Sequence, residues 1–366
     1  MHRRADVDVI SEENNEQIRR LDPLRLDDDL RALPALNMAA DVAALVRALG
    51  GALPSEASIA AFTTTECLAA MRDLGMYLGS LQRHGVSAFE AVPGAARSFQ
   101  LLGRRTRMIP RDTVYHYTSW NPIGERERLY TGHPMERNLI NAVRTCVPHL
   151  ARAVDIGRSL LDEDPAAPTH ADRLASLTSH IAVADTVMSG VRVTVAPEFF
   201  ARVLRPFYED VRVGGRAYMG PAAAHIPIFL IDLLLWASDR GSPDYLQFCA
   251  EVASQTLPQW QQRYAEWAGT PSVTSRVVAA LEGPGTSSAD EHVESSARSL
   301  RHALQTLTAF RGKHLVMARR AYQEELRLYE LGSGGGSVGL LEEILALTRK
   351  NSAMLNATAG QRVQLP

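Results

Sequence analysis

The sequence predicts a mostly α-helical protein, in which a small helical region precedes a larger one with longer helices. Three observations support this prediction. Apolar residues recur three and four positions apart through most of the chain, capping threonines and helix-ending glycines bound several of these runs, and only residues 191–195 (VRVTV) alternate convincingly as a strand does. A content of 46% hydrophobic and 22% charged residues is ordinary for a globular protein.

The first part of the chain divides into a tail and a set of short helices. Residues 1–22 are polar, mixed in charge and aperiodic, which predicts a flexible tail. Between residues 23 and 110, short amphipathic stretches alternate with proline breaks, and two of these stretches end at glycine, one at Gly50 and one at Gly85. Residues 23–110 are therefore expected to form a small helical N-terminal domain.

Residues 111–366 are expected to form a second, larger helical domain. The stretch 109–134, at its start, lacks a clean period and carries proline, glycine and several aromatic residues, as long ordered connections with a function often do. The helices that follow are expected at residues 135–161, 171–188, 197–208, 221–236, 243–266, 296–331 and 340–357.

Charge and cysteine content argue against several classes of function. The formal net charge of -2 provides no basic field for nucleic acid or for an anionic membrane. Cys67, Cys146 and Cys249 lack CxxC spacing, which disfavours a disulfide framework and a thiolate zinc site and suits a reducing cytosol. The N-terminus has no apolar core of signal-peptide length, and the longest apolar run, 225–236, is interrupted by Asp232 and is too short for a bilayer. A cytoplasmic protein without nucleic-acid or membrane partners is therefore expected.

His314 lies on the apolar stripe of a predicted helix. Leu307, Phe310, Ala318 and Tyr322 occupy the same stripe at helical spacing, so the imidazole is expected to face the protein interior. A neutral imidazole held in an apolar helical bundle is a suitable axial ligand for a haem iron. The alternative is a core histidine that is hydrogen-bonded to a neighbour.

The stretch LGSGGGSVG, residues 331–339, is a second candidate. It is not a phosphate-binding loop, because it has no GxxxxGK pattern and no strand precedes it. Gly334 and Gly335 would let the backbone pass close to a flat ligand, and Ser333 or Ser337 offers a hydroxyl group. The alternative is a flexible connection between two helices.

Aromatic and basic residues upstream suit a small-molecule pocket. Phe200 and Arg205 are five positions apart, so they can border one cavity, and an arginine there can bind a carboxylate through two hydrogen bonds. Trp120, in YHYTSWNP, suits the wall of a pocket for an aromatic substrate. The alternatives are a surface arginine and an aromatic residue that packs a loop onto the core. No HExxH, GxSxG or cysteine-nucleophile pattern indicates another chemistry.

Taken in this order, these motifs resemble the haem-dependent tryptophan dioxygenase and indoleamine dioxygenase superfamily. That superfamily has a Phe-x4-Arg element on one helix, a later histidine on another, and a Gly-(Ser/Thr)-Gly-Gly loop. Here the corresponding residues are Phe200 and Arg205, His314, and residues 332–335.

Longer segments resemble, within that superfamily, the monodechloroaminopyrrolnitrin synthase family of the pyrrolnitrin pathway. They include MRDLGMYLGSLQRHG, WNPIGERERLYTG, LRPFYEDVRVGGRAYMGP, FRGKHLVMARRAY and LGSGGGSVGLLEEILALT, and the resemblance covers the chain from about Leu21 onward. The stretch QEELRLYEL, between Tyr322 and Gly332, departs from the family pattern, which leaves the identity of the substrate open.

The resemblance implies an all-α, indoleamine-dioxygenase-like helical haem domain that follows a small helical N-terminal domain. It also implies a b-type haem with His314 as the ligand of the iron, and a loop in which Gly334 and Gly335 lie against the cofactor. Ser333 would be the catalytic hydroxyl group. Dioxygen would be the co-substrate, with an external electron donor as a further partner.

The implied substrate is an aromatic amino acid. Arg205 would hold its carboxylate, and Phe200, Tyr322 and Trp120 would surround its ring. The expected function is the oxidation of tryptophan or a substituted tryptophan, such as a chlorinated one, with rearrangement to an aminophenylpyrrole as in the pyrrolnitrin family. The alternatives are a haem-dependent dioxygenase or hydroxylase of another aromatic amino acid, and a non-catalytic haem-binding protein.

Overall fold

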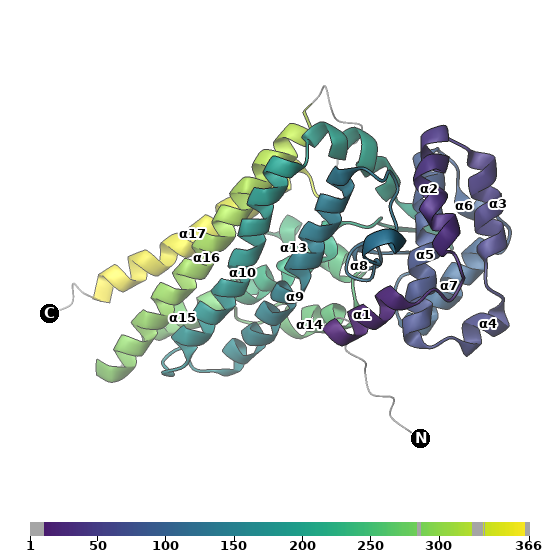
Figure 1. Ribbon diagram of the computed structural model, residues 1–366. Coiled ribbons are helices and arrows are strands. Elements are labelled where there is room, and N and C mark those ends of the chain that lie inside the picture. The colour runs from purple at the N-terminus through teal and green to yellow at the C-terminus, as the bar shows by residue number, and fades with distance from the viewer. Residues whose placement is uncertain (1–10, 284–286, 324–331, 333, 363–366) are drawn as a thin grey trace, which may run out of the picture.

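The computed structural model describes residues 11–283, 287–323, 332 and 334–362, and it confirms the all-α fold (Figure 1). Short helices build the N-terminal third, and their bounds are α1 (Glu12–Arg20), α2 (Asp27–Ala39), α3 (Val42–Ala52), α4 (Glu56–Ala61), α5 (Thr64–Arg83), α6 (Ala88–Ala91), α7 (Ala95–Thr106), α8 (Val114–Tyr117) and the 3-10 turn η1 (Gly124–Arg126). None of the described helices has the length and apolarity that crossing a membrane requires.

Longer helices dominate the remainder of the chain. Their bounds, with those of the short elements between them, are α9 (Pro134–Asp162), α10 (His170–Thr194), η2 (Phe199–Leu204), η3 (Arg205–Tyr208), β1 (Val211–Val213), β2 (Arg216–Tyr218), η4 (Ala223–His225), α11 (Ile228–Asp232), η5 (Leu233–Ala237), α12 (Ser238–Arg240), α13 (Pro243–Ala253), α14 (Pro258–Trp267), α15 (Val273–Glu282), α16 (Ser287–Ala321) and α17 (Val338–Arg362). Figure 1 shows α9, α10, α16 and α17 as neighbouring long rods, in which α10 packs against both α9 and α16, and α16 packs against α17.

Helix α5 is the centre of the N-terminal part. It begins with a capping box, in which the Thr63 hydroxyl accepts from the backbone N–H of Glu66 and the Glu66 carboxylate accepts from that of Thr63. From Cys67 to Leu81 its side chains are buried all round, because α1, α3, α7 and η3 all pack against it.

Two hydrophobic clusters make up the core. One joins the long helices to α11–α15, and the other surrounds α5. The second cluster also includes Tyr117, Tyr130, Ile140 and Val211, which come after residue 110 in the sequence. The N-terminal helices therefore share their core with later segments, and the division of the chain at residue 110 stays a prediction.

The expected strand at residues 191–195 is wrong. Helix α10 continues to Thr194, because its alternating valines are held in a long helix that packs on both sides and buries Val191. The only strands in the described residues are β1 and β2, which pair antiparallel with Val211 opposite Tyr218. Gly214 and Gly215 join them with φ values of 59° and 84°, a backbone conformation that favours glycine.

Several expected helices are interrupted. Residues 197–208 form a π-helical segment, η2, followed by the 3-10 turn η3, and residues 221–236 contain η4, α11 and the π-helical η5. Residues 243–266 form two helices, α13 and α14, because Pro258 begins a new helix. Helix α16 ends at Ala321, and residues 324–331 lie outside the described part.

The expected tail is also partly wrong, because residues 12–20 form helix α1. The Ser11 hydroxyl caps it by accepting from the backbone N–H of Asn14, and Ile18 is completely buried. The Asn15 side chain accepts a hydrogen bond of 2.9 Å from the indole N–H of Trp120. The helix is thus fixed by a contact 105 positions away, which local composition does not reveal.

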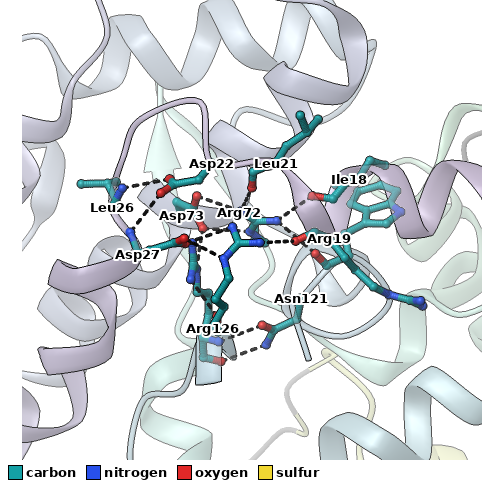
Figure 2. A network of polar contacts seen from close by, with 12 residues as sticks. Ile18, Arg19, Leu21, Asp22, Leu26, Asp27, Arg72, Asp73, Asn121 and Arg126 are labelled. Atoms are coloured by element: carbon teal, nitrogen blue, oxygen red, sulfur yellow. Dashed lines mark hydrogen bonds and ion pairs between the residues drawn. The ribbon is translucent and has the colours of Figure 1, made fainter. Parts of the chain in front are cut away.

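A buried ionic network ties α1 and α2 to α5 and to the loop that follows α8 (Figure 2). The Arg72 guanidinium donates to both carboxylate oxygens of Asp73, at 2.8 and 2.9 Å, and to the backbone oxygens of Ile18, Leu21 and Trp120. Asp73 also binds Arg128 at 3.0 Å.

Asp27 supplies the second carboxylate of this network. It forms ion pairs with Arg126, at 2.6 Å, and with Arg128, at 2.5 Å. Through these pairs the irregular stretch 109–134, expected as an ordered connection, is anchored to buried helices.

Candidate functional site

A mostly apolar cavity of about 330 Å³ lies among the long helices and the segments that precede and follow them. Side chains of α9, α10, α16 and α17 contribute to its wall, including Val143, Met188, Phe310 and Ile344. Its size and apolar lining are those of a small-molecule site. Its polar side chains, within the described residues, are Tyr117, Thr118, Tyr208, Tyr245, Arg311, His314 and Tyr322.

His314 lines this cavity, as its position on the apolar stripe predicted. Its ring lies 6.1 Å from that of Phe310, and no described residue hydrogen-bonds to either ring nitrogen. Burial, and then the nearby Arg311 cation, lower the pKa of His314 to about 4. At neutral pH the imidazole is therefore uncharged and has a nitrogen lone pair available, which fits a metal ligand better than a hydrogen-bonded core histidine.

Arg311 lies one helical turn before His314 and also lines the cavity. It forms an ion pair with Asp232, whose carboxylate also accepts hydrogen bonds from the Tyr245 hydroxyl and, at 3.3 Å, from the Trp236 indole N–H. Burial lowers the pKa of Arg311 to about 9, so the guanidinium stays charged at neutral pH.

Neither member of the Arg311–Asp232 pair was recognised from the sequence. A signal exists in both cases. Asp232 is the one charged residue in the apolar run 225–236, and Arg311 precedes His314 by three positions. A charge in such a run is costly unless it is paired, so it predicts a buried partner.

The glycine-rich stretch contributes backbone to the cavity wall at Gly332, Gly334 and Gly336. The Gly332 N–H donates to the Gly336 oxygen and the Gly335 N–H donates to the Gly332 oxygen, both at 2.9 Å, so these residues form a compact turn. A Cβ atom on Gly334 would lie 2.3 Å from that of Ala224, so only glycine fits this close approach.

Gly335, Ser333 and Tyr322 are the other predicted site residues in or just before the glycine-rich stretch. Gly335 has a φ of 78° but is not part of the cavity wall, and Ser333 lies outside the described residues. Tyr322 follows α16 and lines the cavity together with His314.

Phe200 and Arg205 are one π turn apart, because the Arg205 backbone N–H donates to the Phe200 oxygen. Phe200 lines the cavity, whereas Arg205 is buried beside it, with its Nη1 atom 3.4 Å from the backbone oxygen of Tyr208. The structure therefore brings Phe200, His314, Tyr322 and the glycine turn together, and it leaves Arg205 outside the described wall.

Trp120 lies outside the described wall of the cavity, and its expected contact with substrate stays a prediction. It is completely buried, its indole N–H is bonded to Asn15, and its ring packs edge-on against His116 at 4.7 Å. The alternative interpretation, an aromatic residue that packs a loop onto the core, describes its place.

The chain matches a protein-family model over most of its length. The family described as monodechloroaminopyrrolnitrin synthase PrnB matches residues 16–364. The match spans the cavity, α16 and the glycine turn, so it covers every residue that the sequence motifs singled out, and it confirms the resemblance recognised from those motifs.

Proposed function

Because the chain belongs to the monodechloroaminopyrrolnitrin synthase family, an enzyme family of haem-dependent oxygenases that act on tryptophan derivatives, we propose that it oxidises tryptophan or a chlorinated tryptophan with dioxygen at a b-type haem. His314 is the proposed ligand of the iron. The observation that carries this proposal is a neutral imidazole that faces an apolar cavity with no hydrogen bond to either nitrogen within the described residues. The haem, when bound, supplies the redox chemistry.

The protein would position the substrate and keep water away from it. The apolar wall excludes water, and Phe200 and Tyr322 are placed to contact an aromatic ring. Gly334 packs closely against Ala224, and the backbone at Gly332, Gly334 and Gly336 closes one side of the cavity. Ser333 is proposed to donate a hydrogen bond to the oxygen co-substrate, and Gly334 and Gly335 to lie near the cofactor.

The first experiment tests the cofactor and its ligand. We expect the purified protein to bind haem with a Soret absorption band, and His314→Ala to lose that band. His302→Ala is a matched control, because His302 lies on the same helix with an exposed side chain. If His314→Ala binds haem with an unchanged spectrum, the ligand assignment is wrong.

The second experiment identifies the reaction. Reduced protein is incubated under oxygen with tryptophan, 7-chlorotryptophan and tyrosine, and the products are identified by mass spectrometry. Mass changes with tryptophan or 7-chlorotryptophan support the proposal, and the product separates rearrangement from dioxygenation. Turnover of tyrosine alone would favour another aromatic amino acid, and a haem protein that converts none of them would be a non-catalytic binder.

The proposed roles of Arg205 and Ser333 need separate variants. Arg205→Leu is expected to weaken tryptophan binding, measured as the ligand-induced Soret shift, while haem content stays the same. Ser333→Ala is expected to leave affinity near the wild-type value and to slow turnover. An unchanged dissociation constant in the first, or an unchanged rate in the second, would remove that residue from the site.

A further inference from the structure

An exposed groove backs onto the cavity along the line where α9 packs against α10. The groove holds about 220 Å³, and its lining includes the exposed polar residues Asn141 and Thr194. Ala142, Val187 and Val191 line both the groove and the cavity. We call these three residues the seam, because at each of them one side chain is all that separates the cavity from the groove.

The seam lies between two hydrogen bonds that join α9 to α10. At one end the Asn138 side-chain amide donates to the backbone oxygen of Thr194 at 3.3 Å, and at the other end the Nδ1 atoms of His149 and His180 share a hydrogen bond of 3.1 Å. Among the described residues between these two points, no hydrogen bond or ion pair runs from one helix to the other. The seam is therefore closed by packing rather than by hydrogen bonds.

Each of the two helices also has a residue between these hydrogen bonds that weakens a helix. Pro148 lies inside α9 and has no N–H group to donate to the carbonyl four residues earlier. Gly190 lies inside α10, where the lack of a side chain gives the backbone more freedom than alanine would. Valine side chains are stiff about their first torsion, so the seam opens through a small separation of the helices rather than through a change of rotamer. Pro148 and Gly190 both make this separation easier.

The small size and apolar character of the seam determine what can pass through it. Dioxygen has no charge and needs no hydrogen bonds, so its transfer between apolar side chains costs little free energy. An amino acid carries an ammonium and a carboxylate group, which lose their water in such a passage, and an indole ring needs a much wider gap than a diatomic molecule does. The seam therefore suits a diatomic gas and excludes the amino acid.

We propose that dioxygen passes between solvent and the cavity through the seam, by way of the groove between α9 and α10. The proposal rests on the proposed function, because it takes dioxygen as the co-substrate of a haem in the cavity. The amino acid reaches the cavity by a different route, so a bound substrate does not have to leave before dioxygen enters.

Carbon monoxide tests the route, because it binds to ferrous haem as dioxygen does but is not consumed. Its association with the reduced, haem-loaded protein is followed at the Soret band after laser flash photolysis, and its dissociation is followed by displacement with nitric oxide. Gly190→Leu places a side chain in the groove without displacing neighbours, since a Cβ atom at Gly190 meets nothing within 4 Å. We expect both rate constants to fall about tenfold, which corresponds to about 1.4 kcal/mol added to the barrier for passage, while the dissociation constant stays the same.

An unchanged dissociation constant is the signature of a blocked route. Gly190→Leu leaves the free and the bound states as they are, so association and dissociation must slow by the same factor. Val187→Ala removes two methyl groups from the seam and should speed up both steps. Gly51→Leu, in α3, is the matched control, because it is the same substitution in a helix outside the described cavity wall and its Cβ atom also meets nothing within 4 Å.

The binding rate of L-tryptophan tests the selectivity of the route. This rate is measured as the ligand-induced Soret shift in a stopped-flow instrument, and Gly190→Leu should leave it at the wild-type value. Equal slowing of L-tryptophan and carbon monoxide would show that both ligands enter through the seam, and the proposed separation of routes would be wrong.

The remaining outcomes distinguish this proposal from the one on which it rests. If wild-type protein binds carbon monoxide but Gly190→Leu and Val187→Ala leave its rate constants unchanged, or Gly51→Leu slows it as much as Gly190→Leu does, the route is wrong and the proposed function stands. A weaker affinity with an unchanged dissociation rate would show that Gly190→Leu alters the binding site instead, which also overturns the route. If the wild type binds no haem, the proposed function is wrong and the route falls with it.

Discussion

Replacing Asp73 with asparagine removes one negative charge from the buried ionic network and leaves its shape unchanged. Among the carboxylates of the described residues, only that of Asp73 contacts Arg72, and both side chains are about 1% exposed or less. Arg128 also contacts Asp73, but it keeps Asp27 as a second partner. The variant therefore leaves one buried guanidinium, that of Arg72, without a carboxylate.

The expected loss of unfolding free energy follows from this single unpaired guanidinium. Loss of one partner of a buried ion pair costs about 3–5 kcal/mol of unfolding free energy, because the other charge stays buried without compensation. Arg72 keeps three backbone oxygens, those of Ile18, Leu21 and Trp120, as acceptors at 2.8–3.2 Å. These acceptors partly stabilise the cation, so we expect a loss at the lower end, about 3 kcal/mol.

Urea denaturation followed by circular dichroism measures this loss. The matched control is Asp28→Asn, which breaks an ion pair with Arg31 at a carboxylate whose side chain is 92% exposed. That change should cost less than about 1 kcal/mol. A loss at Asp73 as small as that at Asp28 would show that the three backbone oxygens suffice for Arg72, and the reasoning about the network would be refuted.

Three further predictions concern packing and pH. Gly157→Ala places a Cβ atom 2.1 Å from Leu234 Cδ2 and should lower stability by about 1–3 kcal/mol in thermal melts, whereas Gly190→Ala, with open space around it, should raise it by up to about 1 kcal/mol; equal effects would contradict the packing argument. Gly334→Ala should weaken tryptophan binding at least about tenfold by titration calorimetry, because the turn must move away from the cavity, and unchanged affinity would show that the turn adapts. Burial, and then Arg111, lower the pKa of His225 from an ordinary 6.5 to about 4. Between these pH values the unfolded chain binds a proton that the native protein does not, so the free energy of unfolding falls by about 1.4 kcal/mol per pH unit as the pH drops. His225→Leu should lose this component of the pH dependence of stability measured in urea, and an identical pH dependence would contradict the prediction.

Helix positions were predictable wherever a long amphipathic pattern had clear ends. The helix expected at 135–161 is α9, and the one expected at 340–357 lies within α17. The apolar stripe also placed His314 on the correct face, since three- and four-residue spacing determines which side chains share a face.

The features that escaped prediction depend on contacts between distant segments. Asn15 and Trp120 are 105 positions apart, and Arg311 and Asp232 are 79 apart, so no local window contains both partners. The same holds for α1, whose polar sequence forms a stable helix only because Ile18 and Asn15 dock onto the protein. Helical propensity decides little when docking supplies the stabilisation.

Residues 191–195 illustrate the opposite failure, in which a local pattern was misleading. Alternating β-branched residues favour a strand, but Val191 is buried on a helix that was already packed against two neighbours. Continuing α10 to Thr194 costs less free energy than ending the helix where neighbouring helices already fill the core. The glycine pair at 214–215 was the better indicator of strands, because it permits the tight turn between β1 and β2.

The shape of the cavity beside η2 depends on the number of residues in this π-helical segment. A π turn contains one residue more than an α turn, so deletion of a single residue from 199–204 would allow the segment to relax into an ordinary helix. Each residue of an α-helix rotates by about 100° around the axis, so such a deletion would rotate Phe200 relative to Arg205 without changing the chemistry of either side chain. Shortening η2 is therefore a route to re-engineer which ring shapes the cavity accepts, with the long helices behind it left intact.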